Sequence, residues 1–130
     1  MTVQEWIDAY RRAWNDKDAD GAAHLFTQDS SYRDHPFGEP HLGQDGVRSY
    51  WQQVTSTQSD VNARFGAPIV TADGRRAAVE FWVTMLNSGA QATLTGILFL
   101  HFGADGRCED LREAWHFTEG MLEPPATWGS

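Results

Sequence analysis

Residues 30–40 read S-S-Y-R-D-H-P-F-G-E-P, and this stretch holds a carboxylate, an imidazole, aromatic side chains and two prolines where a short strand should run out into a loop. Residues 30–33 are typical of a short strand, and Pro36 keeps His35 out of helical geometry and ends that element. The next residues form a loop rich in glycine and proline. Asp34 therefore stands where a strand runs out into a loop, and if the protein has chemistry we expect Asp34 to carry it.

Three helices are predicted around this stretch. Thr2 and Glu5 form a capping box for the first, whose apolar side chains recur at helical spacing, namely Val3, Trp6, Ile7, Tyr10 and Trp14. A shorter second helix is expected to begin at an aspartate cap and to run through Phe26. The third is predicted over residues 44–55, with one apolar stripe formed by Val47, Tyr50, Trp51 and Val54.

After Thr57 the periodicity changes from helical to alternating, which predicts strands over residues 59–71, 76–87, 90–102 and 107–117. Each connection contains the glycine, aspartate or asparagine that a tight hairpin needs. The chain is therefore expected to form an α+β fold, a curved antiparallel meander with three N-terminal helices on its concave side that enclose a pocket. We expect a single domain over residues 1–118 and an irregular C-terminal tail over residues 119–130.

The composition argues against several classes of partner. A formal net charge of −8 disfavours binding to nucleic acid or to an anionic membrane. The single cysteine, Cys108, cannot form an intrachain disulfide, which favours a reducing, cytoplasmic location. The chain opens directly into an amphipathic pattern rather than a signal segment, and no apolar run approaches the roughly 20 residues that span a bilayer.

Three motifs carry a resemblance to a known family: W-N-D-K-D-A-D-G-A-A-H-L-F-T-Q-D at 14–29, Y-R-D-H-P-F-G-E-P at 32–40 and G-Q-D-G-V-R-S-Y-W at 43–51. With the order of predicted elements, they make residues 3–118 resemble the cone-shaped fold of the nuclear transport factor 2 superfamily. Within it, the chain looks most like the SnoaL-like and ketosteroid-isomerase-like branch. This fold hosts isomerases, cyclases, dehydratases, epoxide hydrolases and pure binders, so the resemblance implies no single activity.

The resemblance implies roles for individual residues. Asp34 matches the catalytic base of ketosteroid isomerases, and Tyr10 matches their oxyanion-hole tyrosine. Trp51 stands where those enzymes have a second, supporting tyrosine. Their second oxyanion donor, a protonated aspartate, falls on Leu98, and losing one such donor typically costs about 10²–10³ in rate. Leu98 therefore argues against steroid isomerisation itself, but not against proton abstraction by Asp34.

Glu113 is the second chemical candidate. Alternation places it between Leu111 and Trp115 on the apolar face of the last strand, and a tight turn at 104–105 would set it opposite Gly96. Cyclases of the SnoaL type and epoxide hydrolases carry an acidic residue on a late strand, and Glu113 is a counterpart by resemblance. If Asp34 and Glu113 both face inward, their pKa values should separate and give one acid and one base.

A more ordinary interpretation exists for each candidate. Asp34 would then cap the loop before a proline, Tyr10 would be a core tyrosine, and a one-residue register shift would turn Glu113 into solvent. The histidines show no metal-ligand spacing, so no metal is expected. The predicted substrate-binding residues are the inward apolar and aromatic side chains Trp14, Phe26, Tyr32, Phe37, Trp51, Phe81, Val83, Met85, Leu98, Leu100, Leu111 and Trp115.

The leading functional hypothesis is a cofactor-independent enzyme that abstracts or transfers a proton on a small apolar carbonyl compound, as an isomerase, cyclase or dehydratase does. One alternative is a non-catalytic module that binds a small molecule or another protein, and a further one is an epoxide hydrolase. The outward face of the meander carries Trp82, Ile97 and Phe99. Such exposed side chains predict burial by a partner, and we expect a homodimer formed sheet to sheet.

Overall fold

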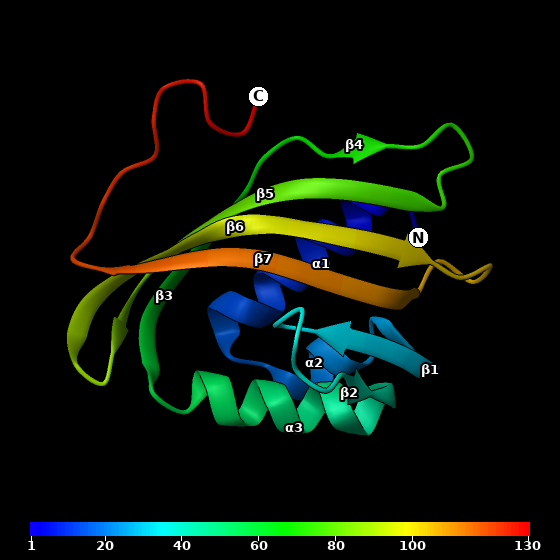
Figure 1. Cartoon of the computed structure of the whole chain (residues 1–130), viewed down its shortest axis with the longest axis horizontal. Helices are drawn as coiled ribbons and strands as arrows, with labels where there is room; N and C mark the ends of the chain where they lie inside the picture. The colour runs from blue at the N-terminus through cyan, green and yellow to red at the C-terminus, as the bar shows by residue number, and fades with distance from the viewer.

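The computed structural model describes residues 1–130, and one curved, open sheet forms most of it, with the long helix α1 lying behind the sheet as seen in Figure 1. The elements, in chain order, are α1 (Val3–Asp16), α2 (Ala19–Ala23), β1 (Phe26–Arg33), β2 (His41–Leu42), α3 (Gly43–Thr55), β3 (Gln58–Phe65), β4 (Ile69–Val70), β5 (Arg76–Asn87), β6 (Ala90–Phe102) and β7 (Cys108–Glu119). The predicted α+β class with three helices is confirmed.

The sheet is mixed rather than purely antiparallel. Its strand order is β2-β1-β7-β6-β5-β3, and β4 pairs with β5 outside this path. The predicted antiparallel meander is confirmed for β3, β5, β6 and β7, whereas β1 runs parallel to β7. The predicted strand 59–71 is divided into β3 and β4, because Pro68 lies between them and cannot donate a ladder hydrogen bond.

The first helix begins as the sequence indicates, and the second ends earlier. Thr2 Oγ1 accepts a hydrogen bond from the Glu5 backbone amide at 3.1 Å, and the Glu5 carboxylate accepts one from the Thr2 amide at 2.9 Å. The expectation that α2 continues through Phe26 is wrong. Phe26 begins β1 and pairs with Cys108 of β7, so a long-range strand contact overrides the local helical pattern.

The register between β6 and β7 differs from the expectation by two residues. The predicted tight turn at 104–105 is instead a wider loop, closed by a hydrogen bond from the Gly103 amide to the Arg107 carbonyl at 2.8 Å, and the register shifts between His101 and Phe102. Glu113 therefore pairs with Leu98 and not with Gly96. A shift of two residues keeps each side chain on the same face, so Glu113 still faces inward.

The C-terminal tail lies along the outer face of the sheet. Residues 120–130 form no helix or strand, but Trp82 Nε1 donates to the Leu122 carbonyl at 2.9 Å and the rings of Trp82 and Trp128 meet edge to face. Trp82 is therefore partly covered by the tail, whereas Ile97 and Phe99 remain 50% and 43% exposed. None of the helices has both the length and the apolar character needed to cross a bilayer.

Candidate active site

A cavity of about 320 Å³ lies on the concave side of the sheet, against α1 and α3. Aromatic and aliphatic side chains form most of its wall, and two carboxyl groups and several amide and hydroxyl groups also face it. Its lining consists of Tyr10, Trp14, Tyr32, Asp34, Tyr50, Trp51, Val54, Thr55, Thr57, Gln58, Met85, Asn87, Leu94, Glu113, Trp115 and Phe117.

Asp34 lies at the rim of this cavity, directly after β1. Its Oδ1 is 2.9 Å from His41 Nε2, and its backbone carbonyl accepts a hydrogen bond from Trp115 Nε1 at 2.8 Å. The Asp34 and His41 side chains are each 30% exposed. The His41 ring stacks on Tyr50 with 4.2 Å between ring centroids, so α3 supports the imidazole that holds the carboxylate.

Glu113 lies at the centre of a tyrosine cluster. Tyr32 donates to Glu113 Oε1 at 3.2 Å and Tyr50 reaches the same oxygen at 3.5 Å. The hydroxyls of Tyr10 and Tyr32 are 3.1 Å apart. Because Tyr32 has one hydroxyl hydrogen and gives it to Glu113, Tyr10 is the donor in that pair. The hydroxyl hydrogen of Tyr10 is therefore directed to Tyr32 and not to a ligand.

The environment of Glu113 keeps its carboxyl group neutral at pH 7. Burial raises the pKa of Glu113 to about 8, and the charge of Asp34 acts in the same direction, whereas the hydrogen bonds from Tyr32 and Tyr50 lower it. Since both hydroxyls converge on Oε1, the acidic proton belongs on Oε2. Burial, reinforced by the nearby charge of Glu113, also raises the pKa of all three tyrosines, which therefore remain neutral donors.

Leu98, the position that resemblance assigns to a second oxyanion donor, is fully buried and pairs directly with Glu113 on the neighbouring strand. The apolar side chain cannot donate, but a protonated carboxyl group lies beside it. The donor that is missing at Leu98 therefore has a neighbour, the carboxyl group of Glu113, at the same level of the concave face.

The residues expected to contact a substrate are divided between the pocket wall and the core. Trp14, Tyr32, Trp51, Met85 and Trp115 line the cavity. Six others are buried behind it and do not line it, namely Phe26, Phe81, Val83, Leu98, Leu100 and Leu111.

Phe37 does not reach the cavity. It is 93% exposed and lies near His35, because β1 ends at Arg33 and the following loop projects into solvent. Its expected place in the pocket is therefore wrong.

The polar groups at or beside the cavity that were not predicted from the sequence include His41, Tyr50, Gln58 and Asn87. The position of Tyr50 could have been predicted, since it lies on the apolar stripe of α3. His41 approaches Asp34 only because β2 folds back on β1 and pairs with Tyr32, a contact that spacing alone does not show. No group of three histidine, cysteine, aspartate or glutamate side chains is arranged to hold a metal ion.

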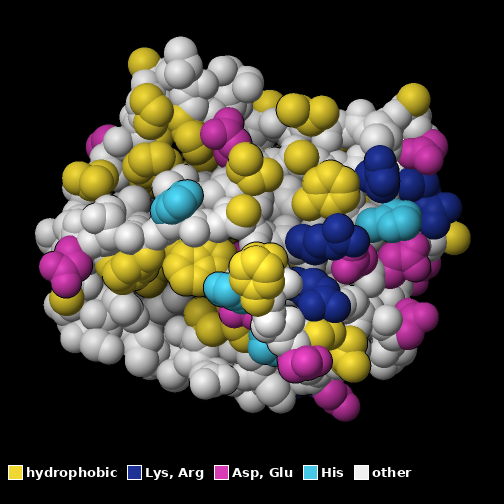
Figure 2. Space-filling model, viewed as in Figure 1, with side chains coloured by type: hydrophobic (Ala, Val, Ile, Leu, Met, Phe, Trp, Pro, Cys, Tyr) yellow, Lys and Arg dark blue, Asp and Glu magenta, His cyan; other side chains and the backbone are white.

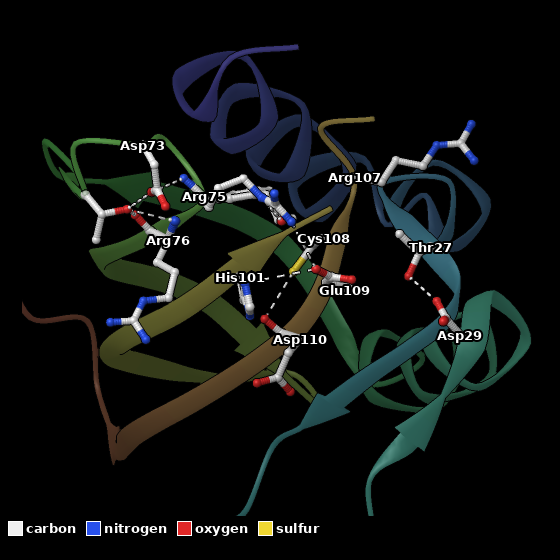
Figure 3. A network of polar contacts seen from close by, with 12 residues as sticks. Thr27, Asp29, Asp73, Arg75, Arg76, His101, Arg107, Cys108, Glu109 and Asp110 are labelled. Atoms are coloured by element: carbon white, nitrogen blue, oxygen red, sulfur yellow. Dashed lines mark hydrogen bonds and ion pairs between the residues drawn. The ribbon is translucent and has the colours of Figure 1, made fainter. Parts of the chain in front are cut away.

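A separate polar network joins the ends of β5, β6 and β7, as Figure 3 shows. Arg75 Nη2 and Glu109 Oε1 are 3.6 Å apart, and both side chains are partly exposed, so this pair contributes at most about 1 kcal/mol. The Cys108 thiol donates to the Asp110 carbonyl, and burial raises its pKa to about 12. The thiol is therefore unreactive, and the network is structural.

Comparison with known proteins agrees with this architecture. The SnoaL-like domain family matches residues 7–111. The structure is similar to that of SalBIII, described as an epoxide hydrolase/cyclase-like enzyme in pyran ring formation in the polyether salinomycin, with 18% identity, a TM-score of 0.78 and coverage of 90% of this chain and 95% of that one. No curated protein matches the sequence.

Two mycobacterial structures show the same fold. A Delta 5-3-ketosteroid isomerase from Mycobacterium sp. is 16% identical with a TM-score of 0.77, covering 91% of this chain and 98% of that one. RV0760c from Mycobacterium tuberculosis is 14% identical with a TM-score of 0.80, covering 91% and 96%. Because the family match extends over most of the 130 residues, the chain belongs to the SnoaL-like family.

Proposed function

We propose that this protein is a cofactor-independent enzyme that transfers a proton on a small apolar carbonyl compound, in a reaction of the isomerase, cyclase or dehydratase type. One observation carries the proposal: two carboxyl groups in contrasting environments face the same cavity. Asp34 lies at the rim with an imidazole beside it, whereas burial among tyrosines raises the pKa of Glu113 to about 8. Two carboxyl groups that differ in this way are suited to act as base and acid.

The reaction begins with the substrate carbonyl oxygen hydrogen-bonded to the Oε2 hydrogen of Glu113. Asp34 removes a proton from the carbon next to the carbonyl, the electron pair of that C–H bond forms a carbon–carbon double bond, and the π pair of the C=O bond moves onto the oxygen, which Glu113 protonates. In an isomerisation, Asp34 returns its proton to another carbon and Glu113 recovers its own from the enol. In a cyclisation the enol carbon attacks a second carbonyl carbon, Glu113 recovers its proton as the first carbonyl re-forms, and the new alkoxide takes the proton held by Asp34. In a dehydration the enol expels the hydroxyl group of the adjacent carbon, which leaves as water with the proton held by Asp34, and Glu113 recovers its own.

The tyrosines are positioning residues in this scheme. Tyr32 and Tyr50 fix Oε1 of Glu113 and leave Oε2 for the ligand, and Tyr10 orients Tyr32 through its own hydroxyl. This assigns Tyr10 a supporting role rather than direct contact with the substrate oxygen.

Exchange of α-protons with solvent tests the proposal without knowledge of the natural substrate. The protein is incubated in D₂O with apolar cyclic ketones such as 2-decalone, and loss of the α-proton signal is followed by NMR. Asp34→Asn should slow exchange by about 100-fold or more, because general base catalysis typically contributes 10²–10⁴. Asp16→Asn, an exposed aspartate at the end of α1, is the matched control. Equal exchange by wild type and Asp34→Asn would refute the proposal.

Epoxide opening is a second candidate that the same acid and base favour. Glu113 would give its proton to the epoxide oxygen as the C–O bond breaks, while Asp34 takes the proton from the attacking water or hydroxyl group. An epoxide with a pendant hydroxyl, added to the ketone panel, separates the two reactions by product. Saturable binding with neither exchange nor ring opening would identify a non-catalytic binding module instead.

We also propose that two copies associate through the outer sheet face. Ile97 and Phe99 are exposed there, and the Arg76 guanidinium lies 5.8 Å from the centroid of the Phe99 ring. Arg112 and Asp110 flank them, and Figure 2 shows arginines and acidic side chains gathered beside apolar ones on this face. A charged surface that meets its own copy across a twofold axis must offer both signs to complement itself, and this one carries both.

A further inference from the structure

Gln58, at the start of β3, is the polar lining residue whose orientation the structure defines most sharply. It is only 6% exposed, and its Oε1 accepts a hydrogen bond from Trp14 Nε1 at 3.2 Å. An indole nitrogen only donates, so the amide oxygen must face Trp14 and the amide nitrogen must face away from it. Nε2 has no hydrogen-bond partner in the protein, although the side chain lines the cavity.

Asn87 lies directly across from Gln58 and repeats this arrangement. The two residues are paired on β3 and β5, so their side chains are neighbours on the concave face. Asn87 Oδ1 accepts a hydrogen bond from Thr57 Oγ1 at 2.9 Å, and its Nδ2 has no partner. Two amide groups, each with its oxygen occupied, therefore present N–H donors to one part of the cavity.

We propose that Gln58 and Asn87 form a second recognition point, which binds an acceptor oxygen of the ligand at a distance from the reacting carbonyl. Both residues line the cavity and neither nitrogen is sealed off from it, so a ligand oxygen that enters can accept a hydrogen bond there. The inference deepens the proposed function, on which it rests, by defining the substrate class: apolar compounds with two oxygen functions, one for Glu113 and one for the amides.

The helix α1 shows that the two points are separate places along the cavity. Tyr10 belongs to the Glu113 cluster and Trp14 holds Gln58, and these two residues are one helical turn apart, about 6 Å along the axis. Two fused six-membered rings carry their terminal oxygens further apart than a single ring does, which suits two separate points. The expected ligand is therefore bicyclic or of similar length, with oxygen at both ends.

The test compares decalin-2,6-dione with 2-decalone, which lacks the second oxygen. Neither probe absorbs strongly where tryptophan does, so quenching of Trp14 and Trp51 in the pocket wall reports binding. We expect wild type to bind the dione about tenfold more tightly, about fivefold from one hydrogen bond and about twofold from its two equivalent carbonyls. Gln58→Leu and Gln58→Glu should reduce the ratio to about two, the statistical value without that hydrogen bond.

Two further variants make the result specific. Gln52→Leu changes an exposed glutamine of α3 and should keep the full preference. Gln58→Glu retains an oxygen that accepts from Trp14. If Gln58→Leu does not fold, Gln58→Glu therefore shows whether the preference for the dione depends on the amide nitrogen. Asp34→Asn should lose proton exchange but keep the preference for the dione, which separates this inference from the proposed reaction. An unchanged dione preference in both Gln58 variants, or no binding of the dione by wild type, would overturn it.

Discussion

Replacing Glu113 with glutamine should make the protein more stable at high pH, and the structure gives the sign and size of the effect. The pKa of Glu113 is about 8 in the folded protein, against 4.5 for an ordinary glutamate. Between these values the folded chain binds a proton that the unfolded chain has released. The free energy of unfolding therefore falls as the pH rises through this window and levels off above pH 8.

The difference between the two pKa values corresponds to at most about 5 kcal/mol, at about 1.4 kcal/mol for each tenfold change. The side chain is only half-buried, which screens its charge, so we expect about 2–3 kcal/mol of this to be measurable. Glutamine keeps the oxygen that accepts from Tyr32 and Tyr50 and has no charge to bury. Glu113→Gln should therefore match wild type near pH 5 and exceed it at pH 9.

Urea denaturation at pH 5, 7 and 9 measures this difference for wild type and Glu113→Gln. Glu39→Gln, at an exposed glutamate in the loop after β1, is the control and should track wild type at all three pH values. Subtracting the free energy of unfolding of wild type from that of Glu113→Gln at each pH removes the contribution of the other titrating groups. A stability difference that stays constant from pH 5 to pH 9 would overturn this prediction, because it would mean that Glu113 is already ionised in the folded protein.

Three other changes have definite expected outcomes. His41→Asn should lower kcat for α-proton exchange about tenfold with little effect on KM, because the imidazole positions Asp34. Tyr32→Phe removes a hydrogen bond that lowers the pKa of Glu113, so that pKa, followed by NMR, should rise further; a fall would count against the assigned contact. Phe99→Glu should convert a dimer into a monomer in light scattering at micromolar concentration, and a monomeric wild type would contradict the proposed interface.

The local patterns in the sequence predicted the inner face of the sheet well. Side chains alternate along β5, β6 and β7 with a period of two, so the inward position of Glu113 survived an error of two residues in its pairing. Phe26 shows where local patterns fail. Its partner, Cys108, lies 82 positions further along the chain, and no short window contains that contact.

For the same reason, only part of the candidate site could be predicted from the sequence. Asp34 and Glu113 could be proposed from their type and from family resemblance. The support for them comes from His41 and Tyr50, which meet them only through the folding of β2 and α3 onto β1 and β7. Gln58 becomes informative only when its contact with Trp14 is known.

The proposed reaction depends on Glu113 being a neutral acid in a cavity that it shares with Asp34. The pKa of Glu113 tests this point directly. It can be measured by a pH titration of ¹³C-labelled glutamate carboxyl groups followed by NMR, and the Glu113 signal is assigned by its absence in Glu113→Gln. We predict a midpoint of about 8. A midpoint near 4.5, the ordinary value, would show that Glu113 is ionised at neutral pH and is not the acid of the reaction.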